Sequence, residues 1–431
     1  MNLLQREWQR ATNSLMARNA GWMFIGQAAN LVLQAVYFVI LGRLLGSAEY
    51  GIFVGAFAFI NLVTVYSSMG SGTVLLRYVS SDRARFAVYW GNVLLTILFC
   101  GGIIVAIAYF VAPYALNPQS AALVLLAGIA NCFCGEITRN AALAFQAHED
   151  MKLTAILNFA TNAARLVAAA SLFFAFHRVS AYVWMLTAVG MSALAAVAAL
   201  VLVLQRYGKP AFSFVLMWKK LPEGFNYSFA LSTTSVYNDV DKSILSHYGM
   251  NVANGIYSLA YRVIDAATTP VSSIRDAALP RFFREGSSNI SALKSLVFRI
   301  QKRAFITSIL VSAALYLIAP VVPMLAGKSF AESASAVRWL CLLPIIRGVH
   351  GIIGNGTLAM GKQIYRTIPQ VGIAGFNFLI NLYWIPRYGW RGAAWSSLLS
   401  DGLLAVCNTV IFLALSRKAI ASANENSHIA V

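Results

Sequence analysis

The chain has 431 residues, of which 59% are hydrophobic and only 11% are charged. Soluble globular domains carry roughly 25% charged residues, so this chain lacks the polar side chains needed to cover an aqueous core. The 33 Lys and Arg residues exceed the 15 Asp and Glu residues, which gives a formal net charge of +18. In so apolar a chain this excess favours basic cytoplasmic loops, and we expect no nucleic-acid partner.

Lipid is therefore the expected outer solvent, and only helices or a closed barrel can span it. The stretches Phe99 to Ala112 and Met191 to Leu204 are apolar without the alternation of barrel strands, which favours helices. The five cysteines lie in apolar segments and are interpreted as packing residues. We expect neither a disulfide framework nor a metal site.

The chain contains about twelve windows of the length needed to cross a bilayer, which is about twenty apolar residues. The predicted spans are 20–44, 51–70, 87–112, 119–140, 153–176, 180–204, 225–247, 253–277, 302–326, 332–359, 365–385 and 391–416. The weakest is 225–247, which Asp239, Asp241 and Lys242 interrupt. The fold class expected is an all-α integral membrane protein.

Most Lys and Arg residues outside the spans fall in the connections on the same side as the N-terminus, which predicts that both termini are cytoplasmic. No small-residue cleavage site of a signal peptide precedes the first span. The predicted organisation is an amphipathic cytoplasmic segment at 1–19, a six-helix bundle at 20–204, a cytoplasmic linker at 205–223, a second six-helix bundle at 224–416 and a cytoplasmic tail at 417–431.

The two halves of the chain share a short pattern. The residues Gly46 to Phe53, which follow the first predicted span, resemble Gly249 to Tyr257, which follow the seventh. Likewise Ser180 to Trp184 resembles Gly392 to Trp395 at the start of the sixth and twelfth spans. Because six spans is an even number, both halves insert in the same orientation. The repeat predicts two bundles related by a pseudo-two-fold axis along the membrane normal, with a cavity between them.

Ionisable residues inside the spans carry the most information, because each costs about 2.5–3.5 kcal/mol at a helix centre. Those nearest the expected midplane are Arg165, Arg262, Asp265, Arg347 and Asp401, while Asp239, Asp241 and Lys242 are expected in the outer half. Glu136 and Arg139 are expected at a cytoplasmic helix end, where long side chains reach water.

These charges have structural and functional interpretations. Arg262 and Asp265 are three residues apart, so they can form a structural ion pair on one helix face. Lys242 can pair with a neighbouring helix. Arg165, Arg347 and Asp401 have no local partner of opposite sign, and we favour a functional role for them. A cavity with several arginines suits an anionic ligand, because guanidinium groups bind phosphate oxygens in bidentate fashion. Carboxylates in the same cavity could bind a coupling cation or neutralise the arginines.

Several motifs together resemble those of the polysaccharide-transporter (Wzx-type) flippases of the multidrug/oligosaccharidyl-lipid/polysaccharide (MOP) exporter superfamily. The matching stretches are Arg18-Asn19, Leu41 to Gly46, Tyr50 to Phe53, Asp241 to Leu245, Gly255 to Arg262 and Leu279 to Arg281. The similarity extends over essentially the whole chain, and the twelve-helix, two-bundle architecture of the family agrees with the internal repeat.

The resemblance implies a flippase that moves an undecaprenyl-pyrophosphate-linked oligosaccharide, such as an O-antigen, capsule or exopolysaccharide repeat unit. It would carry this substrate by alternating access from the cytoplasmic to the periplasmic leaflet of a bacterial inner membrane. Expected partners are membrane lipids, a polysaccharide polymerase and glycosyltransferases. We expect no cofactor, and a proton gradient, a Na⁺ gradient or the membrane potential would drive the cycle.

The predicted site has no catalytic residue and no metal. The residues expected to bind pyrophosphate or sugar are Arg165, Arg262, Arg347, Lys242 and Arg18, and the ion-coupling candidates are Asp239, Asp241, Asp265 and Asp401. A small-molecule or multidrug exporter of the same superfamily is the main alternative. A lipid II-type flippase commonly has two further helices, and a polymerase or ligase would usually have a large external loop, so both fit less well.

Overall fold

The computed structural model describes residues 15–429, and every regular element in that range is helical, which confirms the all-α prediction. Residues 1–14 of the predicted amphipathic segment lie outside the described residues. The elements are α2 (Leu15–Thr64), α3 (Ser71–Ser81), η1 (Arg83–Arg85), α4 (Phe86–Ala115), α5 (Pro118–Ala121), α6 (Val124–Gly128), η2 (Ile129–Gly135), α7 (Glu136–Ala147), α8 (Met151–Phe176), α9 (Ala181–Tyr207), α10 (Phe214–His247), α11 (Asn251–Ser288), α12 (Ile290–Ile318), α13 (Val321–Ala326), η3 (Lys328–Phe330), α14 (Ser333–Leu340), α15 (Leu343–Ala359), α16 (Gln363–Tyr388) and α17 (Trp390–Ile429).

The chain divides into two compact units, Met1–Val252 and Ala253–Val431. The division falls after α10, so that helix belongs to the first unit by its packing. The sequence pattern assigned residues 224–247 to the second bundle instead, and the symmetric partition into two six-helix bundles stays a prediction. A non-helical stretch between α9 and α10 lies within the predicted linker 205–223.

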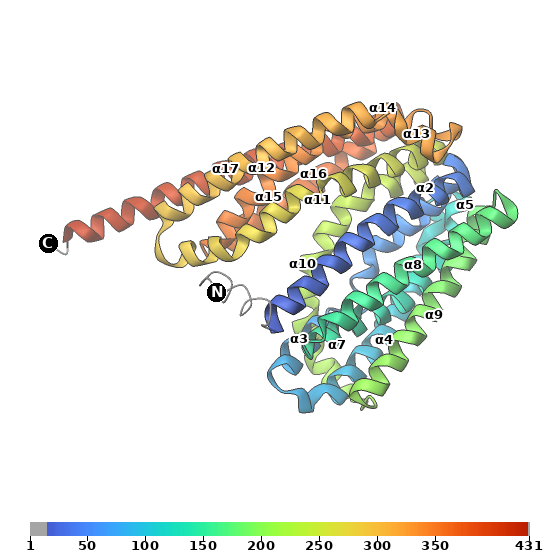
Figure 1. The fold of residues 1–431 in the computed structure, drawn as a ribbon, viewed down its shortest axis with the longest axis horizontal. Coiled ribbons are helices and arrows are strands. Elements are labelled where there is room, and N and C mark those ends of the chain that lie inside the picture. The colour runs from blue at the N-terminus through green and yellow to red at the C-terminus, as the bar shows by residue number, and fades with distance from the viewer. Residues whose placement is uncertain (1–14, 430–431) are drawn as a thin grey trace, which may run out of the picture. The chain divides into compact units, whose positions relative to one another are not determined.

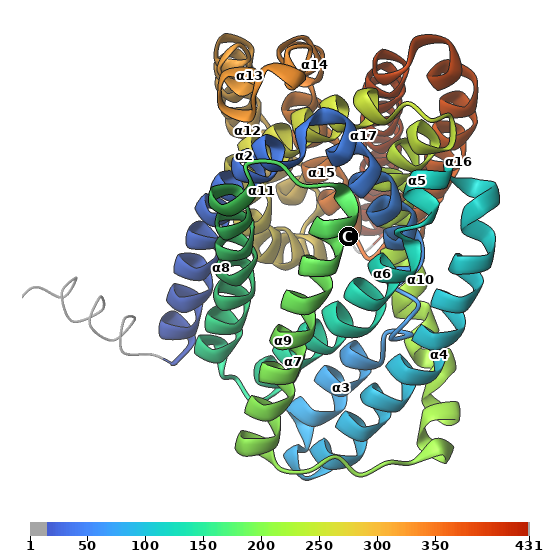
Figure 2. The same ribbon diagram turned by 90° about the vertical axis from the view of Figure 1, so that its right-hand side faces the viewer.

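In the first unit, α2 packs along α8, and α8 lies beside α9 (Figures 1 and 2). The core of this unit is built from α3, α4, α7 and α9 around fully buried Trp90 and Phe145. In the second unit, α15 and α16 both pack against α17, and α12 packs against α15. Phe282, Val297 and Phe412 are fully buried in its core.

Eight helical segments within residues 15–429 are long and apolar enough to cross a membrane, judged by length and composition. They are Ala29–Thr64, Arg83–Ala115, Met151–Phe176, Ala181–Tyr207, Ile290–Ile318, Ser333–Ala359, Gln363–Tyr388 and Trp390–Ala421. The predicted spans 20–44 and 51–70 fall largely in α2, and 119–140 is divided among α5, α6, η2 and α7. The predicted spans 225–247 and 253–277 lie in α10 and α11, which carry several charged residues.

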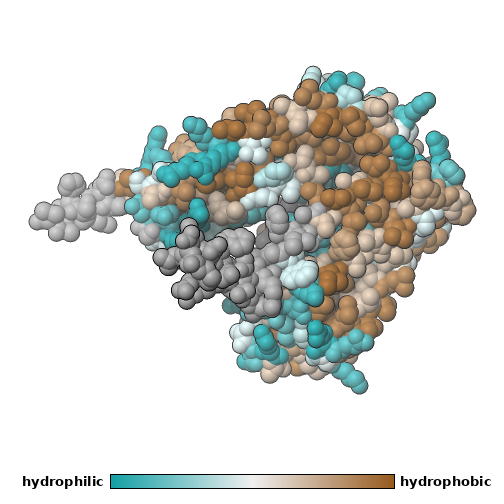
Figure 3. Space-filling view, viewed as in Figure 1, coloured by the Kyte–Doolittle hydropathy of each residue, from teal (hydrophilic) through white to brown (hydrophobic). Residues whose placement is uncertain are grey.

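The outer surface of the first unit matches a lipid environment. Apolar side chains cover the face of α8 and α9 that Figure 3 shows, and hydrophilic side chains gather towards the helix ends. Phe110, Val167 and Leu194 are each more than half exposed. Exposure of large apolar side chains over whole helices is costly in water, so lipid is the solvent that this surface fits.

The internal repeat has a local structural counterpart. Gly46 interrupts α2 with φ 70° and ψ 172°, and Gly249, its partner in the repeat, has φ 67° between α10 and α11. Residues that have a Cβ rarely adopt a positive φ, which explains why both copies of the repeat begin with glycine. The shared sequence pattern therefore places a glycine with positive φ at the matching position of each half.

A compact junction joins α3 to the start of α10. Gly70, which immediately precedes α3, has φ 60° and lies against the backbone of Gly224 on α10. A Cβ on Gly70 would lie 2.4 Å from the carbonyl oxygen of Gly224. Nearby, the Glu223 carboxylate accepts hydrogen bonds from Lys220 (2.9 Å), Arg77 (3.1 Å) and the Tyr78 hydroxyl (3.2 Å). The hydrogen bond from Lys220 is the main cause that lowers the pKa of Glu223 below its ordinary value of 4.5.

Replacing Gly70 with Ala should destabilise the first unit by roughly 1–3 kcal/mol, because the new Cβ combines a left-handed backbone with a clash against Gly224. Thermal unfolding of the purified protein in detergent measures this. Gly190→Ala is the control, since a Cβ on that helical glycine has no neighbour within 4 Å. Equal melting temperatures for the two variants would contradict the close approach at the junction.

Glu223→Gln should lower stability at neutral pH and lose this deficit in acid. A carboxyl with a lowered folded-state pKa stabilises the fold above its unfolded pKa, and that contribution disappears as the pH falls through the folded value. The difference in melting temperature from the parent should therefore shrink below about pH 4.5. Asp276→Asn, at an exposed carboxylate in the second unit, controls for general acid effects. A deficit that is unchanged in acid would refute this account.

Candidate functional site

The first unit contains a cavity of about 580 Å³. Its walls come from the turn between α2 and α3, from α3, η2, α7, α8 and α9, and from one face of α10. This volume lies within the range of small-molecule sites, roughly 300–1,000 Å³. All the lining residues belong to the first unit, so this cavity is distinct from the cavity that the sequence predicted between two bundles.

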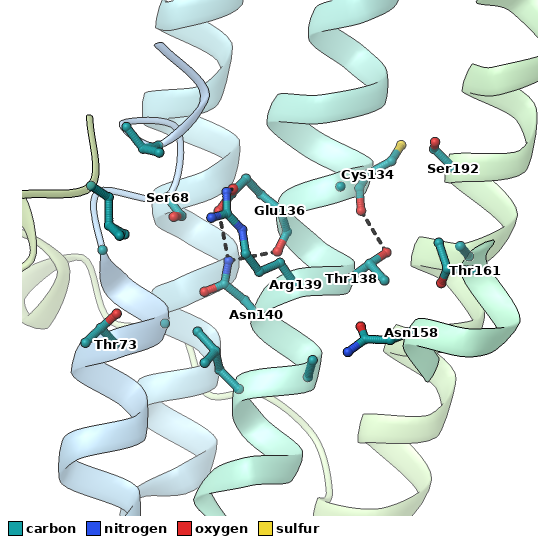
Figure 4. A pocket seen from close by; sticks show the side chains of 18 of the residues that line it. Ser68, Thr73, Cys134, Glu136, Thr138, Arg139, Asn140, Asn158, Thr161 and Ser192 are labelled. Atoms are coloured by element: carbon teal, nitrogen blue, oxygen red, sulfur yellow. Dashed lines mark hydrogen bonds and ion pairs between the residues drawn. The ribbon is translucent and has the colours of Figure 1, made fainter. Parts of the chain in front are cut away.

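The lining of this cavity combines charged, neutral polar and small apolar residues. Its charged members are Glu136, Arg139 and Arg165. Its neutral polar members are Ser68, Thr73, Thr138, Asn140, Gln146, Asn158, Thr161, Ser192 and Ser228. Figure 4 shows Glu136, Arg139 and Asn140 on one wall, with Asn158, Thr161 and Ser192 on the opposite side. Two guanidinium groups and a single carboxylate give the lining a net positive charge.

Glu136 is the most deeply buried of these charges, with 1% of its surface exposed. Residues three and four positions apart share a helix face, and α7 uses this spacing to partner the carboxylate. Arg139 Nη2 donates to Oε1, and Asn140 Nδ2 donates to Oε2 at 3.1 Å. The Arg139 side chain is itself 49% exposed, so the ion pair reaches from the protein interior to the cavity.

Close packing of α3 against α7 fixes this wall. A Cβ on Gly72 would lie 1.7 Å from Asn140 Oδ1, so only glycine lets the two helices approach this closely. The Asn140 amide also donates to the Glu136 backbone oxygen at 2.8 Å. The orientation of the amide that holds the carboxylate therefore depends on a glycine in the neighbouring helix.

The structure changes the interpretation of this segment. Sequence reasoning put Glu136 and Arg139 at a helix end in contact with water; for Glu136 this is wrong, because α3, α9 and α8 pack around α7 and bury the carboxylate. Arg165, by contrast, was singled out from the sequence and does line the cavity. Glu136, Arg139 and Asn140 were missed as site residues. The spacing of an acid followed three residues later by Arg within an apolar stretch was the available signal.

A second polar cluster of the first unit lies on α10. Lys242 forms an ion pair with Asp239 at 3.0 Å, and its ammonium group lies 4.0 Å from Asp241. Asn61 on α2 donates to Asp239 Oδ2 at 3.4 Å. The three predicted site residues of α10 therefore lie in one cluster, in which the Lys242 ammonium group is shared between the carboxylates of Asp239 and Asp241. This arrangement does not favour an added anion.

The second unit gathers three more predicted residues in one network. Arg347 on α15 forms ion pairs with Asp265 on α11 at 2.9 Å and with Asp401 on α17 at 3.2 Å. It also donates to the Tyr261 hydroxyl. Asp401 is 1% exposed, and the Nε2 atom of His350 lies 3.4 Å from its second oxygen. Two carboxylates thus neutralise Arg347, which makes the network better suited to a cation than to a phosphate.

Two predicted residues remain outside these groups. Arg262 is half-buried on α11, next to Tyr261. Arg18 lies in the first turn of α2, and its side chain is outside the described residues. Among the described side chains, no group of three or more His, Cys, Asp or Glu residues could hold a metal ion.

Comparison with solved structures defines the class of the protein. An inward-facing multidrug resistance MATE transporter of the MOP superfamily superposes with a TM-score of 0.73 at 17% identity, covering 94% of this chain and 99% of that one. The lipid II flippase MurJ in an inward closed conformation gives 0.72 at 12% identity, covering 93% and 90%. The eukaryotic MATE transporter AtDTX14 gives 0.59 at 15% identity, covering 95% and 98%. The chain is therefore a multi-pass integral membrane protein with the MOP transporter fold.

The family follows from the sequence match. The model of the polysaccharide biosynthesis protein family matches residues 16–285, which is more than half of the chain. The chain belongs to this family, and its resemblance to the polysaccharide transporters is confirmed. Its fold is the one seen in the multidrug resistance transporter of the MOP superfamily. A comparison with curated proteins gave no match.

The Arg347–Asp401 pair should show strong energetic coupling, because Asp401 is buried and loses its guanidinium partner when Arg347 is removed. We expect a double-mutant cycle of Arg347→Ala and Asp401→Ala to give a coupling energy of about 1–3 kcal/mol. Reversible unfolding in mixed detergent micelles measures it. The exposed pair Arg275–Asp276 is the matched control, at about 0–1 kcal/mol. A coupling energy no larger than in the control pair would exclude the network.

Proposed function

We propose that the protein is a flippase that translocates an undecaprenyl-pyrophosphate-linked oligosaccharide from the cytoplasmic to the periplasmic leaflet of a bacterial inner membrane. The observation that carries the proposal is the cavity of the first unit, in which Arg139 and Arg165 outnumber the single carboxylate of Glu136. Membership of the polysaccharide biosynthesis protein family supports a glycan substrate.

The lining chemistry suits a pyrophosphoryl sugar. Guanidinium groups bind phosphate oxygens through paired N–H donors, and partial burial strengthens these charge-assisted hydrogen bonds. Amide and hydroxyl groups such as Asn158, Thr161 and Ser192 can pair with sugar hydroxyls. The volume admits a head group of this kind, whereas a polyprenyl tail is too large and too apolar and would stay in the surrounding lipid.

The remaining predicted residues fit a division of roles. The candidates for substrate contact remain Arg262, Arg347, Lys242 and Arg18. Of these, Arg347 and Lys242 each already form ion pairs with two aspartates. Asp239, Asp241, Asp265 and Asp401 stay the candidates for ion coupling, with Na⁺, a proton or the membrane potential as the driving force. Both termini would be cytoplasmic, and a polymerase and glycosyltransferases would be the functional partners.

A multidrug exporter is the second candidate, because the MATE structures share the fold. Many such drugs are cations, and in the first unit's cavity the only carboxylate is already paired with Arg139. A cationic ligand would meet a net positive lining there, which favours the anionic substrate.

Complementation of a bacterial strain that lacks its own oligosaccharide flippase tests the proposal, with surface polysaccharide as the readout. Arg165→Ala should reduce export by roughly 10-fold or more, since losing a charge-assisted phosphate contact costs about 1.5–3 kcal/mol. Arg178→Ala, on the exposed connection between α8 and α9, is the matched control and should export normally.

Membrane levels of each variant are measured in parallel by immunoblotting. Full export by Arg165→Ala would remove this cavity from the substrate path. Resistance to cationic dyes without restored polysaccharide would favour the multidrug exporter instead.

A further inference from the structure

The Glu136–Arg139 pair lies where a bound pyrophosphate would compete for it. The carboxylate is 1% exposed, whereas the arginine side chain is 49% exposed and lines the cavity. An anion entering the cavity thus meets the guanidinium side of the pair first. Phosphate oxygens are strong acceptors in the same bidentate geometry as a carboxylate, so ligand and Glu136 are rival partners for one cation.

Withdrawal of Arg139 towards a ligand would leave Glu136 with little compensation. Its remaining donor is the Asn140 amide, 3.1 Å from Oε2. An ionised carboxylate buried with one neutral donor is strongly disfavoured, and such a group normally takes up a proton instead. A protonated Glu136 keeps the Asn140 hydrogen bond, because its carbonyl oxygen still accepts.

The other ionisable groups around Glu136 do not replace Arg139. Among the lining residues they are Arg165 on α8, which faces the same cavity and would contact the same ligand, and Cys134 on η2. Cys132 on η2 also interacts electrostatically with Glu136 and Arg139, but a neutral thiol offers no charge. The cavity residues of α3, α9 and α10, and of the turn before α3, are uncharged. Arg139 is therefore the cation on which ionised Glu136 depends.

Charge balance points the same way. A pyrophosphate diester carries two negative charges, which Arg139 and Arg165 match. With Glu136 ionised the loaded cavity would keep one excess negative charge, and with Glu136 protonated it is neutral. A site with no net charge has a lower electrostatic free energy in a low-dielectric surrounding than a site with one excess charge.

We propose that Glu136 is a proton site coupled to substrate binding. The pyrophosphate forms an ion pair with Arg139 in place of Glu136, and Glu136 accepts a proton from water. When the substrate leaves, Glu136 gives the proton back and recovers Arg139. The coupling rests on the proposed function, in that the ligand is a pyrophosphate diester. It adds to the cavity a carboxylate absent from the four aspartates that the sequence suggested for ion coupling.

Binding of a soluble pyrophosphate diester, farnesyl-pyrophosphoryl-N-acetylglucosamine, to the full chain in nanodiscs tests the coupling. This probe has no group that titrates near neutral pH, so a pH dependence of its affinity reports on the protein. The affinity of the parent protein should rise as the pH falls, by up to about tenfold per pH unit for one proton.

Glu136→Gln mimics the protonated state, so it should bind the probe more tightly than the parent does at high pH, with little pH dependence. A gain of affinity at high pH cannot come from a misfolded variant. Asp82→Asn is the matched control, because Asp82 and Arg85 have the same three-residue spacing but are exposed to solvent. It should follow the parent at every pH.

The outcomes separate the two proposals. Binding by the parent that is independent of pH, or a Glu136→Gln variant with the parent's pH dependence, would overturn the proton coupling and leave the flippase proposal standing. Calorimetry in two buffers of different ionisation enthalpy gives the same answer independently, as about one proton taken up by the parent and none by the variant. Absence of probe binding by the parent would overturn both.

Discussion

A charge removed from water needs either a counter-charge or a change of protonation state, and this requirement governs the interior of both units. Arg347 is held by two aspartates, Lys242 lies between two more, and Glu136 has a single arginine. The three clusters differ in one respect that matters for function. In the last, the arginine lines a cavity of ligand size. The same physical rule thus produces two clusters in which two carboxylates share one cation, and a third in which one carboxylate has one arginine.

Much of the fold could be predicted from the sequence. Apolar windows located α4, α8, α9 and α16 within a few residues, because long uninterrupted apolar stretches leave little alternative in lipid. The fourth predicted span was less well described. Residues 119–140 form several short helices with a π-helical stretch at Ile129–Gly135, and hydropathy carries no information on such changes of helical geometry.

The site was predicted only in part, for reasons that lie in tertiary packing. Arg165 stood out because an isolated charge in an apolar span is conspicuous. Glu136 did not, because its place near the end of a predicted span made access to water the simplest interpretation. Its burial depends on the approach of α3, which Gly72 permits. Likewise the pairing of Arg347 with Asp401 joins residues that are 54 positions apart, which no local spacing rule can detect.

The packing of α10 also bears on how the protein is made. This helix is synthesised after α9, yet it contacts α2, α3 and α4, and its start closes the junction at Gly70 and Glu223. The ten elements from α2 to α9 therefore cannot complete their core when the ribosome reaches residue 207. Their core can be completed only after about forty further residues have been synthesised. Until then, lipid or a membrane chaperone would occupy the position of α10. A chain truncated at the end of α9 would lack one wall of the cavity and one side of the junction.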